Sequence, residues 1–245
     1  MNPLPYITAA ICRAKRLRID GMSHIPAHGP ALIVTAHDSP LDVLYHLSMM
    51  RQVGRRDHRL VMTADMLDPQ RFRRFTRETI RHDVPAAALL AGAVARLGSW
   101  VIPRLMDPLN PIPIYREGDD SASRAESLTC LLSGWVVTIA PERGSAGDRG
   151  ADGLRPLTHG VAAIARRFFE STRESLVIVP VGMTKRRTAS LEQVSLHVGA
   201  PLRAMSDREY PVLFSSAGQE NLAVKHQAYQ HFTQRLTDRL SELNS

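Results

Sequence analysis

Cysteine is scarce in this chain of 245 residues, which contains only Cys12 and Cys130, far apart in the sequence. The two form neither the closely spaced pairs of a zinc site nor the even set of a disulfide-stapled domain. The ten histidines are scattered without paired ligand spacing, so the sequence predicts no metal site. Cysteine usage of this kind is typical of a reducing compartment, and we expect a cytosolic or cytosol-facing protein.

Long hydrophobic runs are missing as well. No stretch reaches the roughly 18 uninterrupted apolar residues of a conventional membrane span. The most apolar segment, 86–106, is broken by glycines, arginines and a proline. The apolar stretch 4–12 has no basic residue ahead of it and no evident cleavage site after it, so we do not expect a signal peptide.

Aromatic residues make up only 5% of the chain, whereas its formal net charge is +7. A positive excess of this size indicates an acidic partner. The low aromatic content and the absence of zinc-finger, ribonucleoprotein and leucine-zipper signatures argue against nucleic acid. An anionic membrane surface, a phosphorylated substrate and an acidic carrier protein each fit, and charge alone does not choose among them.

The residues that are present alternate between predicted strands and predicted helices, and their 44% hydrophobic content can bury a large core. We predict strands at 18–21, 31–36, 59–64, 111–118, 135–140, 176–182 and 194–198. We predict helices at 6–17, from 40 onward, at 69–81, 86–106, through 128–132, at 158–170 and at 221–243. This order predicts an α/β fold, a mixed β-sheet flanked by helices, in a single domain over 18–245. Residues 1–17 carry an N-terminal helix that is a candidate for membrane association.

A His-x4-Asp pattern directly follows the predicted buried strand 31–36. In a strand-turn-helix arrangement His37 and Asp42 can meet, with the carboxylate reaching back to the imidazole from the first helical turn. Ser39 before Pro40 is typical of a helix start. A second interpretation stays open, in which Asp42 only caps the backbone N–H of Ser39 and His37 is an ordinary loop residue.

The next two helices differ sharply in character. Asp68 is predicted to cap helix 69–81, which has basic residues on one face. They are Arg74, Arg77 and Arg81. This face is either simply solvated or a dock for phosphate headgroups or an acidic carrier. The helix over 86–106 is apolar most of the way round, so it is either buried or lines an apolar cavity or a bilayer face.

Further reactive groups follow other predicted strands, at the place where α/β sheets collect their sites. Besides His37 and Asp42 they are Arg116, then Glu142, Arg143, Gly144 and Ser145, and then Pro180. A base, an orienting carboxylate, a cation and a Gly-Ser turn are what acyl transfer to a hydroxyl of a phosphorylated acceptor requires. The sequence therefore predicts such a site at the strand ends.

With these motifs in order, the chain resembles the glycerophosphate and lysophosphatidate acyltransferases that carry an H-x4-D motif. The resemblance runs from about Arg18 to Leu240. The matching blocks are His37 to Asp42, Ile112 to Arg116, Pro141 to Ser145, Leu157 to Gly160, Val179 to Val181 and Val198 to Leu202. The sequence departs from the family in the third block, usually Pro-Glu-Gly-Thr-Arg. Arg143 is inserted there, the arginine after Gly-Ser is absent, and Arg143 or Arg149 is the candidate replacement. His159 stands where a lysine is usual.

The resemblance implies direct acyl transfer without an acyl-enzyme. His37 would deprotonate the acceptor hydroxyl as it attacks a thioester carbonyl, and Asp42 would orient the imidazole. Arg116 would bind an anionic acceptor, with Arg143 as a further candidate, while Glu142, Gly144 and Ser145 would shape the loop. Pro180 would lie in the fourth block.

The partners implied are an acyl-CoA or acyl carrier protein as donor, a lysolipid as acceptor, and the cytoplasmic face of a membrane as the place of work, with no further cofactor. A non-phosphate acceptor such as a glycolipid, an aminolipid or a secondary metabolite stays open. So does a non-catalytic lipid- or carrier-binding module. A serine hydrolase is not predicted, because no G-x-S-x-G occurs.

Overall fold

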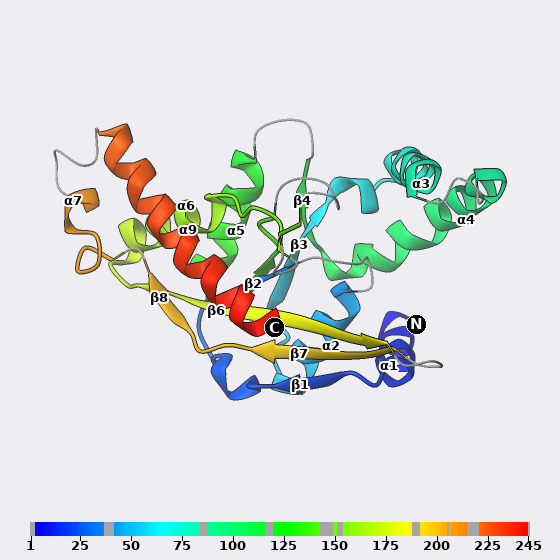
Figure 1. Ribbon diagram of the computed structural model, residues 1–245, viewed down its shortest axis with the longest axis horizontal. Helices are drawn as coiled ribbons and strands as arrows, with labels where there is room; N and C mark the ends of the chain where they lie inside the picture. Colours follow the sequence, from blue (N-terminus) through cyan, green and yellow to red (C-terminus); the bar gives the residue numbers. More distant parts are fainter. Residues whose placement is uncertain are drawn as a thin grey trace.

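The computed structural model describes residues 3–36, 42–83, 88–115, 120–142, 149–150, 154–187, 192–204, 206–214 and 221–244. Its centre is an eight-stranded sheet in the order β1-β7-β6-β2-β5-β3-β4, with β8 also paired to β6 (Figure 1). The strands are β1 (Arg18–Asp20), β2 (Ala31–Thr35), β3 (His58–Thr63), β4 (Ile112–Ile114), β5 (Val136–Ile139), β6 (Leu176–Arg187), β7 (Glu192–Val198) and β8 (Leu202–Ala204). Parallel pairs dominate, but β6 pairs antiparallel with β7 and β8, so the predicted mixed sheet is confirmed.

The helices surround this sheet much as the sequence predicts. In the described part of the chain the α-helices are α1 (Leu4–Ala14), α2 (Asp42–Val53), α3 (Pro69–Asp83), α4 (Ala88–Met106), α5 (Ser121–Leu132), α6 (Gly160–Thr172), α7 (Pro211–Phe214) and α9 (Leu222–Asn244). No helix within the described part of the chain is both long and apolar enough to cross a membrane.

The buried strand β2 divides the core into two layers, because successive side chains of a strand point to opposite faces. Leu32 and Val34 join a cluster with α5, α6 and α9. Ala31 and Ile33 join a second cluster on the other face, which includes Tyr45 of α2 and Cys12 of α1. Every residue of β2 is buried, as expected for a central parallel strand covered on both faces.

Strand β6 is longer than the predicted 176–182 and ends at Arg187. Apart from Met183 the added residues are polar, and hydrophobic patterning alone therefore ended the prediction too early. Pairing with β7 supplies the missing support, with Lys185 opposite Val194. Since β2 pairs with β6 only as far as Thr35 and Val181, the second half of β6 extends beyond the end of β2.

The end of α9 closes tightly over β6. A Cβ on Gly182 would lie 2.4 Å from Cβ of Leu243, which only glycine avoids. The amide of Met183 donates to Oδ1 of Asn244 at 2.9 Å. The C-terminal helix therefore fixes the strand at the point where it leaves β2.

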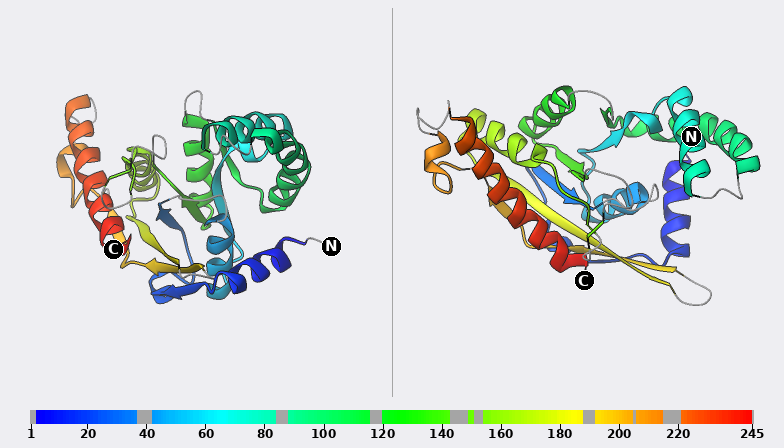
Figure 2. Two further views of the ribbon diagram at one scale, coloured as in Figure 1. Left: turned by 45° about the vertical axis from the view of Figure 1, so that its right-hand side comes forward. Right: turned by 45° about the horizontal axis from the view of Figure 1, so that its top comes forward.

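Helices α3 and α4 pack on each other and stand at one end of the sheet, with α9 at the other end (Figure 2). The predicted cap of α3 is confirmed, because Oδ1 of Asp68 accepts from the amides of Gln70 and Arg71 at 2.9 and 2.8 Å. Where α4 meets the body of the protein it joins a third apolar cluster, in which Met106 packs with Leu4 of α1 and Leu44 of α2.

Candidate functional site

The candidate site lies at the edge of the sheet where its parallel strands end. β2, β5, β3 and β4 run in the same direction, so their carboxyl ends share this edge. Val34 of β2 is in register with Ile139 of β5. In the outer strand pair, Thr63 of β3 is in register with Ile114 of β4. The topology thus brings the carboxyl ends of β2, β4 and β5 to one edge, the kind of place where α/β sheets collect their sites.

Asp42 occupies the first turn of α2 and is almost completely buried, with 1% of its surface exposed. A buried carboxylate needs a charged or hydrogen-bonding partner, because desolvation is otherwise costly. His37, with the rest of 37–41, lies outside the described residues. The predicted contact between His37 and Asp42, and the alternative cap on Ser39, therefore stay predictions.

A lysine faces this carboxylate. Nζ of Lys185 lies 3.5 Å from Oδ1 of Asp42, and 22% of the lysine side chain is exposed. The cation reaches the site because β6 extends past the end of β2. Sequence reasoning missed Lys185, although the alternation of Val181 and Met183 on the α2 side of the sheet continues to this residue.

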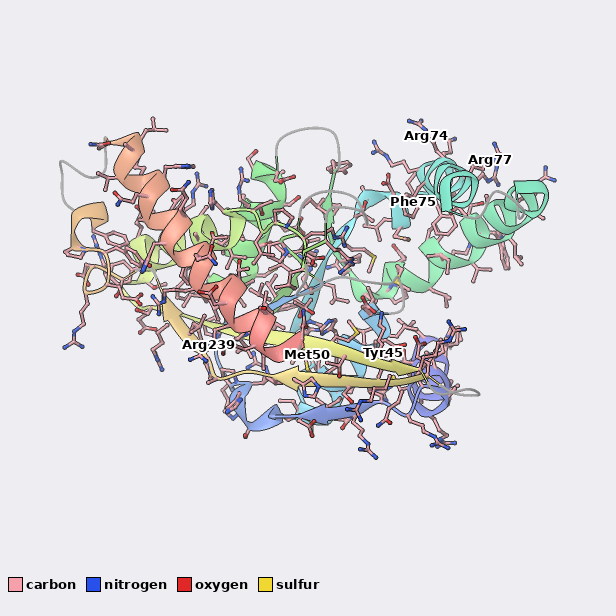
Figure 3. All side chains as sticks on the ribbon, in the orientation of Figure 1. Tyr45, Met50, Arg74, Phe75, Arg77 and Arg239 are labelled. Atoms are coloured by element: carbon pink, nitrogen blue, oxygen red, sulfur yellow. The ribbon has the colours of Figure 1, made fainter. Side chains whose placement is uncertain are left out.

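Tyr45 completes the buried surroundings of Asp42 on α2, and Figure 3 labels it. Burial, and then the negative charge of Asp42, raise the pKa of Tyr45 to about 12, with smaller contributions from Glu192 and Cys12. The phenol therefore stays neutral near pH 7 and adds no negative charge beside the carboxylate. Glu192 is paired with Lys15.

Glu142, predicted to shape the substrate loop, joins the two ends of that loop. Its side chain is 2% exposed, and Oε2 lies 3.0 Å from Nη2 of Arg155. Oε1 also accepts from the backbone amide of Arg155 at 3.2 Å. The backbone of Glu142 forms a bridge with Leu157, and the amide of Thr158 donates to the carbonyl of Pro141 at 2.8 Å. Glu142 is thus committed to protein contacts at the start of the loop.

The remaining predicted loop residues cannot be placed as fully. Arg143, Gly144 and Ser145 lie outside the described residues, as does Arg116 of the second block. Arg149 belongs to the short described piece 149–150. The role of these residues in acceptor binding stays a prediction.

Pro180 lies inside the sheet, in register with Val34. It is buried, and its carbonyl accepts from the amide of Gly199 at 2.8 Å. A Cβ on Gly199 would lie 3.0 Å from Cγ of Pro180, so the ring packs closely beneath that residue. In the structure Pro180 shapes the bend between β7 and β8, and its predicted contact with substrate stays a prediction.

The basic helix α3 contacts the residue that precedes Arg116. The guanidinium of Arg71 in α3 lies 5.2 Å from the ring centroid of Tyr115, the residue before Arg116, so the basic helix reaches the end of β4.

His159, in the block after the substrate loop, faces α9, where Nδ1 lies 3.0 Å from Oγ1 of Thr233 and the ring contacts His226 edge-on. Burial, and then His226, lower the pKa of His159, which therefore does not supply the cation expected at this position.

Comparison with known proteins adds one structural likeness. No protein-family model matches the chain, and no curated protein matches it significantly. A solved structure that is similar is the crystal structure of the 1-acyl-sn-glycerophosphate (LPA) acyltransferase PlsC from Thermotoga maritima. The TM-score is 0.44 with 12% identical residues, covering 97% of this chain and 81% of that chain. A likeness of this size concerns the course of the backbone and assigns no residue of the site.

Proposed function

We propose that this protein is an O-acyltransferase that moves a fatty acyl group from a thioester to a hydroxyl of a lysophospholipid or a related acceptor. The observation that carries the proposal is the buried carboxylate of Asp42 in the first turn of α2, which faces Lys185 in the part of β6 that extends past β2 and ends a His-x4-Asp pattern. A buried charge is costly to stability and is typical of a functional site.

The proposed reaction is a single transfer. His37 takes the proton of the acceptor hydroxyl while the oxygen forms a bond to the thioester carbonyl carbon. The carbon–sulfur bond then breaks and the thiolate leaves. Asp42 orients the imidazole and stabilises its protonated form. A positioned base of this kind contributes roughly 10²- to 10⁴-fold to the rate.

Lys185 is proposed as a positioning residue that acts through Asp42. A carboxylate without a balancing cation would raise the pKa of His37 and hold the imidazole protonated. A protonated imidazole cannot accept the proton of the acceptor hydroxyl. A cation within 4 Å of the same carboxylate offsets part of that effect. The base then has a pKa closer to neutral pH, which favours proton transfer at that pH.

The acceptor is proposed to be anionic and bound by Arg116, with Arg143 or Arg149 in place of the missing motif arginine. Gly144 and Ser145 would shape the loop that Glu142 anchors through Arg155. Either acyl-CoA or an acyl carrier protein would serve as donor, at the cytoplasmic face of a membrane. One observation favours a second candidate, a non-phosphate acceptor: His159 packs against α9 where the family has a cation.

The test is product analysis by mass spectrometry, with thiol release measured in parallel. Purified protein is incubated with acyl-CoA or acyl carrier protein donors and a panel of phosphate and non-phosphate lysolipids. Acceptor-dependent thiol release is expected for the native protein and should be lost in His37→Ala. The exposed His28→Ala is the matched control. Full turnover by His37→Ala would overturn the mechanism. Donor binding without any thiol release would indicate a binding module instead.

Replacing Arg116 separates the two acceptor classes. Arg116→Ala should weaken turnover of phosphate-bearing acceptors much more than turnover of neutral ones, because a charge-assisted hydrogen bond is lost. Equal turnover of all acceptors by this variant would favour the non-phosphate candidate.

A further inference from the structure

The outer face of α4 carries large apolar side chains that contact solvent. Leu97 is 67% exposed and Trp100 is 61% exposed. They lie three residues apart and so share one side of the helix, together with the exposed Arg96 and Arg104. The guanidinium of Arg104 lies 5.2 Å from the ring centroid of Trp100. Exposed aromatic and aliphatic residues flanked by arginines are typical of surfaces that enter a lipid interface.

On the opposite face of α4, Gly98 and Ser99 pack against α3, so Leu97 and Trp100 are not side chains that a small rotation of the helix would bury. A Cβ on Gly98 would lie 2.6 Å from Cε1 of Phe72, which shows how closely α4 packs on α3. Nε of Arg73 donates to Oγ of the buried Ser99 at 2.8 Å. These contacts hold the α4 face with Trp100 outward.

Helices α3 and α4 with the segment between them, residues 69–106, are called here the α3–α4 hairpin, which holds most of the net positive charge of the chain. Residues 69–106 contain seven arginines and two acidic residues, whereas the whole protein has a formal net charge of +7. Arg74 and Arg77 are exposed and project outward from α3, while Phe75 lies on its other side (Figure 3). Each basic residue near an anionic bilayer contributes about 1 kcal/mol of attraction, so charge of this density is significant for binding.

We propose that the α3–α4 hairpin docks the protein on an anionic lipid bilayer, with Leu97 and Trp100 inserted among the headgroups and the arginines bound to lipid phosphates. An acidic carrier protein would account for the arginines, but it would leave the exposed leucine and tryptophan unexplained. Apolar insertion combined with cationic attraction accounts for both features.

The hairpin also lies next to the candidate site. The apolar cluster that anchors the end of α4 includes Val43 and Leu44, which directly follow Asp42 in α2, and Ile102 and Leu105 pack against it from α4. Docking through the hairpin would therefore hold the site close to membrane-embedded acceptor. This last step rests on the function proposed above, whereas the docking itself does not.

The first experiment is co-sedimentation of the full chain with vesicles of phosphatidylcholine alone or mixed with phosphatidylglycerol. We expect binding to the anionic vesicles that weakens as salt is added. Leu97→Ser with Trp100→Ser should lower the partition coefficient at least tenfold, because two large side chains no longer leave water. Arg74→Gln with Arg77→Gln should lower it about fivefold for each arginine.

Matched controls come from the far side of the molecule. Leu222 is 81% exposed on α9, and Arg203 and Arg208 are exposed near β8. Leu222→Ser, and Arg203→Gln with Arg208→Gln, should leave vesicle binding unchanged. Equal binding by the hairpin variants and the native protein would overturn the proposal. Loss of acyl carrier protein binding with vesicle binding retained would also overturn it, in favour of the carrier.

A second measurement reads insertion directly. The chain has two tryptophans, so Trp135→Phe leaves Trp100 as the single reporter. Its fluorescence emission should shift to the blue when anionic vesicles are added, and brominated lipids should quench it. An unshifted spectrum on bound protein would refute insertion. Neither measurement requires turnover, so failure of docking is distinguishable from failure of the acyltransferase assignment.

Discussion

The end of β2 and the α3–α4 hairpin treat charge in opposite ways. At the end of β2 a single carboxylate, Asp42, is buried to 1% exposure and faces one lysine. On the hairpin, Arg74 and Arg77 extend into solvent and the apolar Leu97 is 67% exposed. The first region buries a charge, which costs stability, whereas the second exposes both charged and apolar side chains to solvent.

The difference indicates which region suits a chemical reaction and which suits binding to a flat partner. A buried charge acts strongly on its few neighbours because little water screens it. Exposed charges act weakly on any one neighbour but sum over a flat partner, and salt screens them. The two proposals made above accordingly place the reaction beside Asp42 and the contact with the membrane on the hairpin. Three changes test this division and a fourth tests the stability of the fold, in order of decreasing effect.

Replacing the buried carboxylate should have the largest effect. Asp42→Asn keeps the size of the side chain but removes the charge that orients His37, and we expect kcat to fall by roughly 10³- to 10⁴-fold. Vesicle binding should not change. The measurement is acceptor-dependent thiol release, with thermal melting to verify folding. An active Asp42→Asn protein would contradict the division, because it would leave the buried charge without a chemical role.

Removing the facing cation should have a smaller effect with a distinct pH signature. In Lys185→Met the carboxylate acts on His37 without a balancing charge, so the pKa of the base rises. The acidic limb of the kcat/KM profile should move to higher pH by roughly one unit. Lys185→Arg should restore the profile. A uniform loss at every pH would point to a purely structural lysine.

The hairpin variant should change the preference between physical forms of the acceptor. For Leu97→Ser with Trp100→Ser, the ratio of turnover on vesicle-embedded acceptor to turnover on detergent-dispersed acceptor should fall about tenfold, as insertion is lost. Kinetics with both acceptor forms give this ratio. An unchanged ratio would mean that the hairpin does not deliver the enzyme to its acceptor.

His58 provides the smallest effect, on stability. Burial, with the charge of nearby His46 as a smaller cause, lowers the pKa of His58 from its ordinary 6.5 to about 3. Below pH 6.5 the unfolded chain binds a proton that the folded protein refuses, so stability present above pH 6.5 is lost as the pH falls toward 3. The loss is about 2 kcal/mol at pH 5.

The check is urea unfolding between pH 4.5 and 7. His58→Gln, which can still bond Oγ1 of Thr138, should show a flatter dependence of the unfolding free energy on pH. An equally steep dependence would assign the acid sensitivity to other groups.

Most of the architecture could be predicted from the sequence, because buried strands and capped helices leave strong local patterns. The strands β2 and β5 are mostly apolar and buried throughout, and Asp68 caps α3 as expected. The length of β6 could not be predicted in this way. Its polar second half is stabilised by β7, a partner that local patterning does not reveal.

The candidate site was predictable only where it follows a motif. Asp42 is buried at the predicted place, but the pairing of His37 with it stays a prediction. Lys185 belongs to no motif, and its position beside Asp42 results from the extension of β6 past β2. The link between Glu142 and Arg155 likewise joins residues whose proximity only the folded chain shows.

The tight packing of α9 on β6 links helix α9 to the lysine that faces Asp42. Gly182 lies three residues before Lys185, and Met183 is bonded to Asn244. A bulkier residue at position 182 would push α9 and β6 apart. This would change the orientation of the Lys185 side chain without direct contact with it. Substitutions near residue 243 should then be found among variants selected for reduced activity. The described part of that helix turn contributes no reactive group of its own.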